Sequence, residues 1–579
     1  MSKNNYLLLF SISPVQSFIS QARKTKDLYT GSRLLSKFLK VQLYKLKELK
    51  TDTQIIFPSD INRDSLPNRF VVKISAETEL DILNIGNELL KNFDRILRDE
   101  FESFAKITGI SFNKDVYITQ MLNTFECYWA SLKIEEDYKI TYLQLEKIHA
   151  AAKNIRKFNQ LNKGKGEQGR KCSLCGERNA YFNADDTSPA FIDESLGIKI
   201  TDFPFHFIKN ESLCTVCAIK RFYNVSFPSI AEIALKDTIP EKDIKILEYD
   251  AELFYNENLT KKYFEKNNIP VSKLEEIKNK RNKILKKFDI KSSDLPKYYA
   301  LIMFDGDNMG KLLAGDFLKD KTKLEDFHRE LSKALSENAE KAKKIVNKYG
   351  QTVYAGGDDF LGFVPLKNLM LSLKELRNIF KVCVNNKLNK MVKREITMSA
   401  GVVIAHYKIP LKTVLDWARI MEKEAKEKGG RDSFTIAVVK HSGEIHKTVW
   451  KWYDIEESNI DRIEKILNKF IEKNFSTNFI HTLEKEFLRL FYEEDNDKEK
   501  DEEKKYRALW DKQFEAELKR LINRSLLIKE NKDKESAELF KLCKSMGEIA
   551  ADVTKKGKNF YNYFELMKII DFMARHLGG

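Results

Sequence analysis

The sequence predicts an α+β protein with two ferredoxin-like (palm- or cyclase-like) domains, a four-cysteine zinc-binding domain between them and a C-terminal helical bundle. Three observations predict it: a strand that runs into an Asp-rich loop ahead of a Gly-Gly-Asp-Asp hairpin, two Cys-x-x-Cys pairs, and helical periodicity in the last part of the chain. At 579 residues the chain is too long for a single core. We expect four domains, at residues 1–150, 151–295, 296–446 and 447–579.

Composition and charge favour a protein that works with a polyanion. The chain is 42% hydrophobic and 32% charged, and its 101 Lys+Arg against 86 Asp+Glu give a formal net charge of +15. Such an excess favours phosphate contacts, although an AT-rich genome would also enrich Lys. No apolar run approaches ~20 residues, and the N-terminus lacks the pattern of a signal peptide. We therefore expect a cytoplasmic protein with no membrane partner.

The first 150 residues have the element order of a ferredoxin-like unit. Strands are predicted at 6–12, 55–57, 70–74, 116–119 and 124–134, and helices from Pro14 onward and over 78–104. Pro suits the start of a helix because its missing N–H would be unpaired there anyway. Polar side chains, among them Gln16 and Arg23, line the first helix. They form either a solvated helix face or a binding surface, and the residues alone leave both open.

Two Cys pairs between the ferredoxin-like units have the spacing of metal ligands. They are Cys172 with Cys175 and Cys214 with Cys217. Four thiolates in a cytoplasmic chain predict a closed tetrahedral Zn²⁺ site, which is structural because no position is left for water. A redox role would normally need one such pair in a thioredoxin-like context. Residues 230–295, which follow, read as a helical, Lys-rich connector.

The third domain carries the acidic residues on which the functional prediction depends. A strand that begins near residue 298 ends in Asp305-Gly306-Asp307-Asn308, and a hairpin over 353–363 has Gly356-Gly357-Asp358-Asp359 at its tip. Adjacent carboxylates repel each other unless a cation neutralises them, and their hard oxygens suit Mg²⁺ or Mn²⁺. Taken alone, the hairpin is equally well explained as a solvated Gly-Asp turn.

The order of elements around these motifs strengthens the metal prediction. Helices at 322–349, 368–390 and 411–427 and strands at 396–405 and 434–439 complete a ferredoxin-like palm. In that order the first strand and the hairpin are neighbours, so Asp305 would meet Asp358 and Asp359. Three carboxylates on adjoining strands are what two-metal nucleotidyl transfer requires, because one ion activates the attacking hydroxyl and the other holds the triphosphate.

We predict that these three Asp residues are catalytic metal ligands. Flanking residues of the two motifs are predicted to bind the nucleotide: Gly306, Asp307, Asn308, Gly356 and Gly357. Asp307 is the weaker candidate because it can simply cap its loop. Beyond the palm, helices are predicted at 460–473, 475–492, 506–526, 536–555 and 560–576. This part has no catalytic constellation and is predicted to be a docking module.

The motifs resemble those of the large polymerase-like subunit of type III CRISPR effector complexes, in the Cmr branch (type III-B). The resemblance rests on the Gly-Gly-Asp-Asp hairpin, on Asp-Gly-Asp-Asn-Met-Gly at 305–310, and on the segments 12–18, 398–406 and 440–444. It extends from the N-terminus to about residue 446. It implies a palm that makes signalling nucleotides from ATP when the complex, with its other subunits and guide RNA, binds target RNA.

The resemblance also implies how nucleotides are held. Metal ions cannot neutralise all the charge of ATP, and in this family a basic residue near the last helix or strand of the palm holds the phosphates. Lys426, Arg431 and Lys440 are the candidates here, although a Lys at a helix C-terminus also offsets the helix dipole. The first domain of the family faces the palm and helps to hold a second nucleotide, a role that would fall to Gln16 and Arg23.

Two classes of function remain open. In the first, the protein is an RNA-activated nucleotidyltransferase that makes cyclic oligoadenylate, or that adenylylates S-adenosylmethionine, as some family members do. In the second, it is a non-catalytic scaffold. The intact carboxylates favour the enzyme, because clustered charges are costly to keep buried. Many family members also carry a nuclease domain of the His-Asp type; none of the eight His in this chain precedes an Asp, so we expect no such nuclease.

Overall fold

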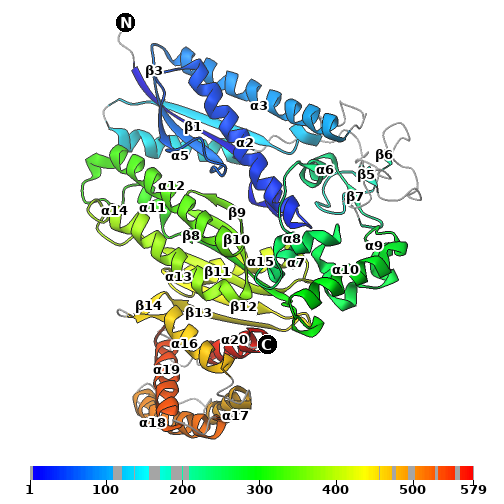
Figure 1. Ribbon diagram of the computed structural model, residues 1–579. Coiled ribbons are helices and arrows are strands. Elements are labelled where there is room, and N and C mark those ends of the chain that lie inside the picture. Colours follow the sequence, from blue (N-terminus) through cyan, green and yellow to red (C-terminus); the bar gives the residue numbers. More distant parts are fainter. Residues whose placement is uncertain are drawn as a thin grey trace.

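Two sheets that share one internal strand order form the framework of the molecule (Figure 1). The structure is a computed structural model. It describes residues 4–108, 120–135, 137–155, 170–180, 182–183, 198–199, 208–454, 457–472, 478–492, 502–527, 532–553 and 561–577. In Figure 1 the N-terminal sheet lies above the larger palm sheet, and the C-terminal helices lie below it.

The first domain is a four-stranded antiparallel sheet with helices on both faces. Its strands are β1 (Asn4–Ser13), β2 (Gln54–Phe57), β3 (Arg69–Ala76) and β4 (Glu126–Lys133), in the order β2-β3-β1-β4. Helices α2 (Thr25–Leu49) and α3 (Glu79–Thr108) cover one face, and α5 (Tyr138–Asn154) packs on the other. This order confirms the ferredoxin-like prediction. The strand predicted at 116–119 lies outside the described residues.

The predicted helix from Pro14 is wrong in its extent. The chain forms only a short α1 (Gln16–Ser20), turns, and begins α2 at Thr25. Asp27 accepts hydrogen bonds from the backbone N–H groups of Arg23 (3.1 Å) and Lys24 (3.0 Å), and it pairs with Arg221 (2.7 Å) with both side chains fully buried. Burial opposes the charge of Asp27, but Arg221 outweighs it and lowers the pKa of Asp27 to about 2. A tertiary ion pair therefore fixes the start of α2.

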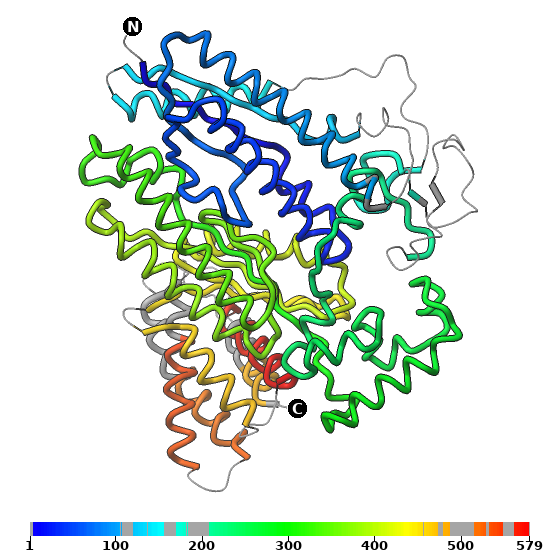
Figure 2. Tube along the Cα trace, turned by 45° about the horizontal axis from the view of Figure 1, so that its top comes forward, coloured from blue at the N-terminus to red at the C-terminus, as the bar shows by residue number. Residues whose placement is uncertain are grey.

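The region between the two sheets consists of a small sheet and a set of short helices. The sheet contains β5 (Phe182–Asn183), β6 (Ile198–Lys199) and β7 (Ser212–Leu213), and α6 (Thr215–Phe222) follows it and packs on the first domain. The predicted helical connector is confirmed; it contains α7 (Ile230–Leu235), α8 (Glu241–Ile244), α9 (Lys261–Lys266) and α10 (Leu274–Lys287). Figure 2 shows these helices at the side of the palm.

The palm sheet has six strands, in the order β13-β12-β11-β8-β10-β9. They are β8 (Tyr298–Gly306), β9 (Gln351–Gly356), β10 (Asp359–Pro365), β11 (Met398–His406), β12 (Ser433–Val439) and β13 (Ile445–Lys451). The helices are α11 (Met309–Leu313), α12 (Leu324–Tyr349), α13 (Leu369–Phe380), α14 (Asn386–Leu388) and α15 (Leu411–Glu427). The order confirms the ferredoxin-like palm. It adds β13, a strand that was not predicted and that contains the expected domain boundary at 446.

The two faces of the palm sheet pack against different parts of the molecule. Along β8, Ile302 and Phe304 face a core formed with α12, α13 and the C-terminal helices, whereas Tyr299 and Leu301 face α15 and the start of α2. Because side chains alternate along a strand, Asp305 belongs to the second face. The end of β8 therefore presents this carboxylate toward α15 and the first domain.

The C-terminal helices form the predicted bundle. After the short strands β14 (Tyr453–Asp454) and β15 (Glu457–Ser458) come α16 (Asn459–Ile471), α17 (Asn478–Tyr492), α18 (Glu502–Ser525), α19 (Lys532–Val553) and α20 (Tyr561–Leu577). Asn562 of α20 exchanges two hydrogen bonds with the backbone of Val449 in β13, both of 2.8 Å. The bundle thus covers the outer edge of the palm sheet. Within the described residues, no helix combines the length and apolar character needed to cross a membrane.

Candidate metal centre and nucleotide site

Three carboxylates converge at one end of the palm sheet. Asp305 lies near the end of β8, Asp358 in the turn after β9, and Asp359 at the start of β10. Phe360 pairs directly with Phe304, so the hairpin and β8 lie side by side, as the predicted strand order requires. One oxygen from each of the three carboxylates lies within 4.8 Å of the others. Carboxylate oxygens at this spacing are a donor set that fits Mg²⁺ or Mn²⁺.

Two glycines allow the carboxylates to come so close. A Cβ atom on Gly306 would lie 3.0 Å from the Cβ of Asp358 and 2.9 Å from the side chain of Met309, which is closer than side chains pack. Gly357 has a φ of +79°, in the left-handed region that favours glycine. Gly306 therefore leaves room for the hairpin to lie close to β8, and Gly357 allows the backbone of the turn to adopt its conformation.

The three carboxylates differ in electrostatic environment. Burial and the charge of Asp305 raise the pKa of Asp358 to about 7. Loss of hydration and the two neighbouring carboxylates also raise the pKa of Asp359 well above its usual value. Burial acts in the same sense on Asp305, but hydrogen bonding with Asp359 and the charge of Lys426 outweigh it, so its pKa is lowered. Crowding thus disfavours full ionisation of the three carboxyl groups, and a bound divalent cation would offset their mutual repulsion.

Lys426 is the predicted cation that the structure brings to the site. It lies at the C-terminal end of α15, on the face to which Asp305 points, and its Nζ forms ion pairs with Asp305 and with Glu422 (2.6 Å). Partial burial opposes its charge, yet the pairing with Asp305 raises the pKa of Lys426. Its ammonium group is therefore fixed at the edge of the carboxylate cluster.

Asp307 and Asn308 hold the loop after β8. The buried carboxylate of Asp307 accepts hydrogen bonds from the hydroxyls of Thr397 and Ser399 (both 2.7 Å) and from the backbone N–H of Asp432 (2.9 Å). Asn308 has a left-handed backbone (φ 56°) and begins α11. Asp307 is thus occupied in joining β8 to β11 and to the loop after α15, rather than grouped with the three carboxylates.

The structure separates the other two predicted palm cations. Arg431 is exposed on the loop between α15 and β12, at the same end of the sheet as the carboxylates. Lys440 lies at the opposite end, because β12 runs parallel to β11 from Phe434 beside Ala400 to Val439 beside Ala405. That run places it roughly 20 Å away along the strands. Lys440 instead pairs with Glu444 (2.9 Å), so its assignment to the phosphates is not supported.

The two predicted residues of the first domain lie outside the carboxylate cluster. The backbone oxygen of Gln16 accepts a hydrogen bond from Arg419 of α15 (3.4 Å), two helical turns before Lys426. Arg23 pairs with Glu211 (3.3 Å), beside the cysteine region. The start of the first domain thus faces the palm, while Arg23 pairs with Glu211 and not with the three carboxylates. The role of Gln16 and Arg23 toward a second nucleotide stays a prediction.

Arg69 is a candidate that sequence reasoning missed. It begins β3, and its Nη1 donates to both oxygens of Glu146 (3.0 and 3.1 Å). Its guanidinium also interacts electrostatically with Asp358 across the domain boundary. An Arg at the start of a strand has no motif around it, so the sequence gives no signal for this role.

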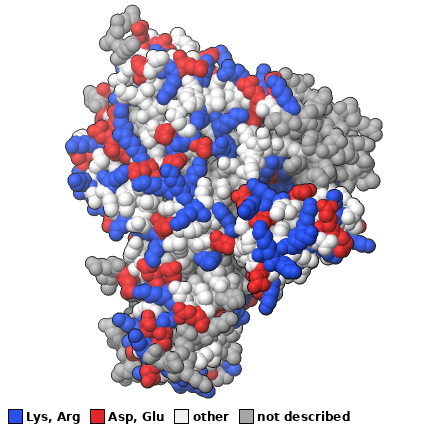
Figure 3. Space-filling view, in the orientation of Figure 1, with Lys and Arg blue, Asp and Glu red and all other residues white. Residues whose placement is uncertain are grey.

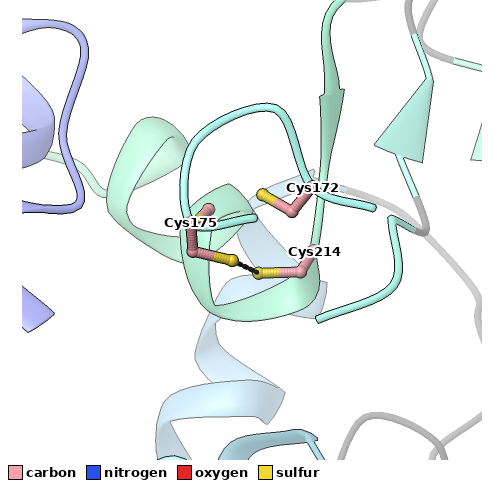
Figure 4. A group of neighbouring side chains, drawn as sticks. Cys172, Cys175 and Cys214 are labelled. Atoms are coloured by element: carbon pink, nitrogen blue, oxygen red, sulfur yellow. Dashed lines mark hydrogen bonds between the residues drawn. The ribbon is translucent and has the colours of Figure 1, made fainter. Parts of the chain in front are cut away.

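The four predicted cysteines form a second cluster of metal-ligand type. Their sulfur atoms lie within 4.8 Å of one another, with 3.8 Å between the Sγ atoms of Cys175 and Cys214. Figure 4 shows Cys172, Cys175 and Cys214 pointing toward one another beside the start of α6, to which Cys217 also belongs. Four thiols at this spacing fit a tetrahedral Zn²⁺ ion.

Comparison with known proteins relates the chain to one family. Residues 298–435 match the family model described as Cas10/Cmr2, second palm domain, and residues 7–106 match CRISPR-associated protein Cmr2, N-terminal. A curated relative, the CRISPR system Cmr subunit Cmr2 of Pyrococcus furiosus, is 26% identical over 78% of this chain. The chain spans 63% of the length of that relative.

Solved structures share the fold. The type III-B Cmr-beta structure in the apo state matches with a TM-score of 0.64 at 16% identity, over 99% of this chain and 82% of the other. The Cmr-beta structure bound to cognate target RNA matches with a TM-score of 0.63 at 15% identity, over 99% and 83%. At this identity the likeness concerns the fold.

Proposed function

The chain belongs to the Cas10/Cmr2 family, and on this premise we propose that it is the large subunit of a type III-B CRISPR effector complex that makes cyclic oligoadenylate from ATP upon target RNA capture. The observation that carries the proposal is the convergence of Asp305, Asp358 and Asp359 on adjoining strands. A scaffold has no need of three crowded carboxylates, whose repulsion destabilises the fold unless a cation is bound.

The residues of the site have separate roles in this proposal. The three carboxylates would hold two Mg²⁺ or Mn²⁺ ions, which activate the attacking hydroxyl and neutralise charge on the triphosphate. Lys426 lies where it can turn from Asp305 to a phosphate oxygen once a cation occupies the carboxylates. Arg431, at the same end of the sheet, is the second candidate for the phosphates.

The proposed partners are the other subunits of the complex, a guide RNA and a target RNA. The Pyrococcus relative is a Cmr subunit, and one matched structure is bound to cognate target RNA. The net charge of +15 supports a polyanionic partner. On the face shown in Figure 3, Lys and Arg are interspersed with Asp and Glu.

Product analysis of the assembled complex tests the proposal. We expect ATP, Mn²⁺ and target RNA to give cyclic oligoadenylate with the wild-type chain, and Asp358→Asn with Asp359→Asn to lower its formation by about 100-fold or more. Asp326→Asn is the matched control, because Asp326 is an exposed acidic residue on α12. Mass spectrometry of the products, with and without S-adenosylmethionine, identifies the acceptor.

Each outcome of this experiment separates the proposals. An adduct that forms only with S-adenosylmethionine would keep the nucleotidyltransferase and replace the cyclic product. A complex that assembles and captures RNA but yields no nucleotide product with any of these substrates would leave the scaffold as the function.

A further inference from the structure

The hairpin that carries Asp358 and Asp359 lies at an edge of the palm sheet. β9 is the outermost strand, so one row of its backbone N–H and C=O groups faces away from β10. Such groups need partners when they are buried, and they invite foreign strands when they are exposed. Whatever covers this edge therefore acts directly on the hairpin.

Side chains of the first domain cover this edge in place of a strand. The loop of residues 58–68, between β2 and β3, passes Ala355 of β9. The backbone N–H of Ala355 donates to the hydroxyl of Ser65 (3.1 Å), and its C=O accepts from Nη2 of Arg63 (3.3 Å). Two side chains thus make the pair of hydrogen bonds that a neighbouring antiparallel strand would make.

Further contacts with α12 and with the turn support these two hydrogen bonds. The Arg63 side chain is only 6% exposed, and its Nε donates to Glu340 of α12 (3.2 Å). Phe57, the last residue of β2, borders the turn: its Cζ would lie 3.9 Å from a Cβ placed on Gly357. Both the strand that leads into the turn and the turn that carries Asp358 therefore rest on the first domain.

The turn cannot fix its own position. Glycine has the greatest conformational freedom of all residue types, and Gly356 and Gly357 lie next to Asp358. Metal ligands, in contrast, must be held to within about 0.5 Å of their working geometry. The neighbouring strand β10 fixes one side of the hairpin through its pairing with β8. On the other side, Ser65 and Arg63 pair with β9 at the level of the turn.

We propose that Arg63 and Ser65 are positioning residues for the carboxylate centre, and that through them the placement of the first domain controls cation binding by Asp358 and Asp359. The inference rests on the proposed function and adds a means of regulation to it. Ala355 precedes Asp358 by only three residues. Any movement of the loop of residues 58–68 along β9 would therefore displace the carboxylates.

Four variants in the assembled complex test this role: Ser65→Ala, Arg63→Ala, Arg63→Lys and Lys343→Ala. The last is the matched control, since the Lys343 side chain pairs with the side chain of Asp64 (3.0 Å) in the same loop. We would measure the Mn²⁺ concentration for half-maximal product at saturating ATP, Mn²⁺ binding by electron paramagnetic resonance, and hydrogen exchange of the peptide 351–360.

We expect Ser65→Ala and Arg63→Ala to raise the half-maximal Mn²⁺ concentration by about five- to tenfold and to speed exchange in that peptide. Arg63→Lys should recover part of the loss, because Lys keeps the charge beside Glu340 but lacks the fork that reaches both partners. Lys343→Ala should change none of the three readouts.

The proposal is overturned if Arg63→Ala and Ser65→Ala show the same Mn²⁺ dependence and exchange as Lys343→Ala. A wild-type complex without product would contradict the proposed function alone. In that case Mn²⁺ binding and hydrogen exchange still decide whether Arg63 and Ser65 position the carboxylates.

Discussion

The two ferredoxin-like domains share the strand order but differ in the connection between their second and third strands. In the palm, Gly357 and Asp358 form a two-residue turn between β9 and β10. In the first domain, residues 58–68 join β2 to β3. The short turn presents carboxylates, and the long loop brings Arg63 and Ser65 to the edge of the palm. The comparison teaches that chemistry in a repeated fold resides in its connections, not in its topology.

The largest effect is expected from removing a carboxylate of the palm. Asp305→Ala removes the carboxylate that links β8 to the hairpin and leaves Lys426 beside Glu422 alone. We expect product formation to fall by about 100- to 1,000-fold, because a metal ligand and its charge are lost together. Product yield at fixed Mn²⁺ measures the fall. An activity within a few-fold of wild type would contradict the metal assignment, provided that complex assembly is unchanged.

The second prediction concerns the cysteine cluster that supports the first domain. Cys172→Ser should remove a metal ligand, so elemental analysis should fall from about one Zn²⁺ per chain toward zero. Helix α6 starts at this cluster and carries Arg221, which pairs with Asp27 in the first domain. We therefore expect the melting temperature to fall by about 5 °C or more. An unchanged zinc content would show that the cluster is not the zinc site.

A third prediction compares two Lys residues at opposite ends of the palm sheet. Lys426→Ala removes the cation beside Asp305 and should raise the KM for ATP by about tenfold. Lys440→Ala, at the opposite end of β12, should leave the KM unchanged. ATP titrations of both variants measure the difference. Equal effects of the two substitutions would show that position relative to the carboxylates does not matter.

The smallest expected effect tests the contribution of the first domain to the charge of the site. Arg69→Gln removes a guanidinium that interacts with Asp358, and we expect the KM for ATP to rise about threefold at low salt and less at high salt. Arg69→Lys keeps the charge and should stay near wild type. A salt-independent effect shared by both variants would indicate a loss of packing with Glu146 instead.

Much of the fold could be predicted because the signals are local. Strand alternation, helical periodicity and the Gly-Gly-Asp-Asp turn can be recognised from residues close together in the sequence. The convergence of Asp305 with the hairpin follows from the order of the elements alone. The break before α2 could not be predicted, because it depends on the pairing of Asp27 with Arg221, which lies far along the chain.

The part of the candidate site that could be predicted is the part whose residues belong to a recognisable motif. Lys440 was misplaced although the predicted strand-helix-strand order already implies a parallel crossover, in which β12 runs away from the carboxylates. Arg63, Ser65 and Arg69 were missed because the palm groups that they reach, the backbone of Ala355 and the carboxylate of Asp358, belong to the other domain. A basic or hydroxyl residue near a strand end has no distinguishing pattern of its own.

The covering of both edges of the palm sheet by side chains has a consequence for dissecting the protein. Asn562 pairs with β13 at one edge, and Ser65 and Arg63 pair with β9 at the other. A fragment of residues 296–446 would lose all three side chains and would also cut β13 in two. Its exposed strands would join those of other copies, so we expect such a fragment to aggregate during expression more than the full chain does.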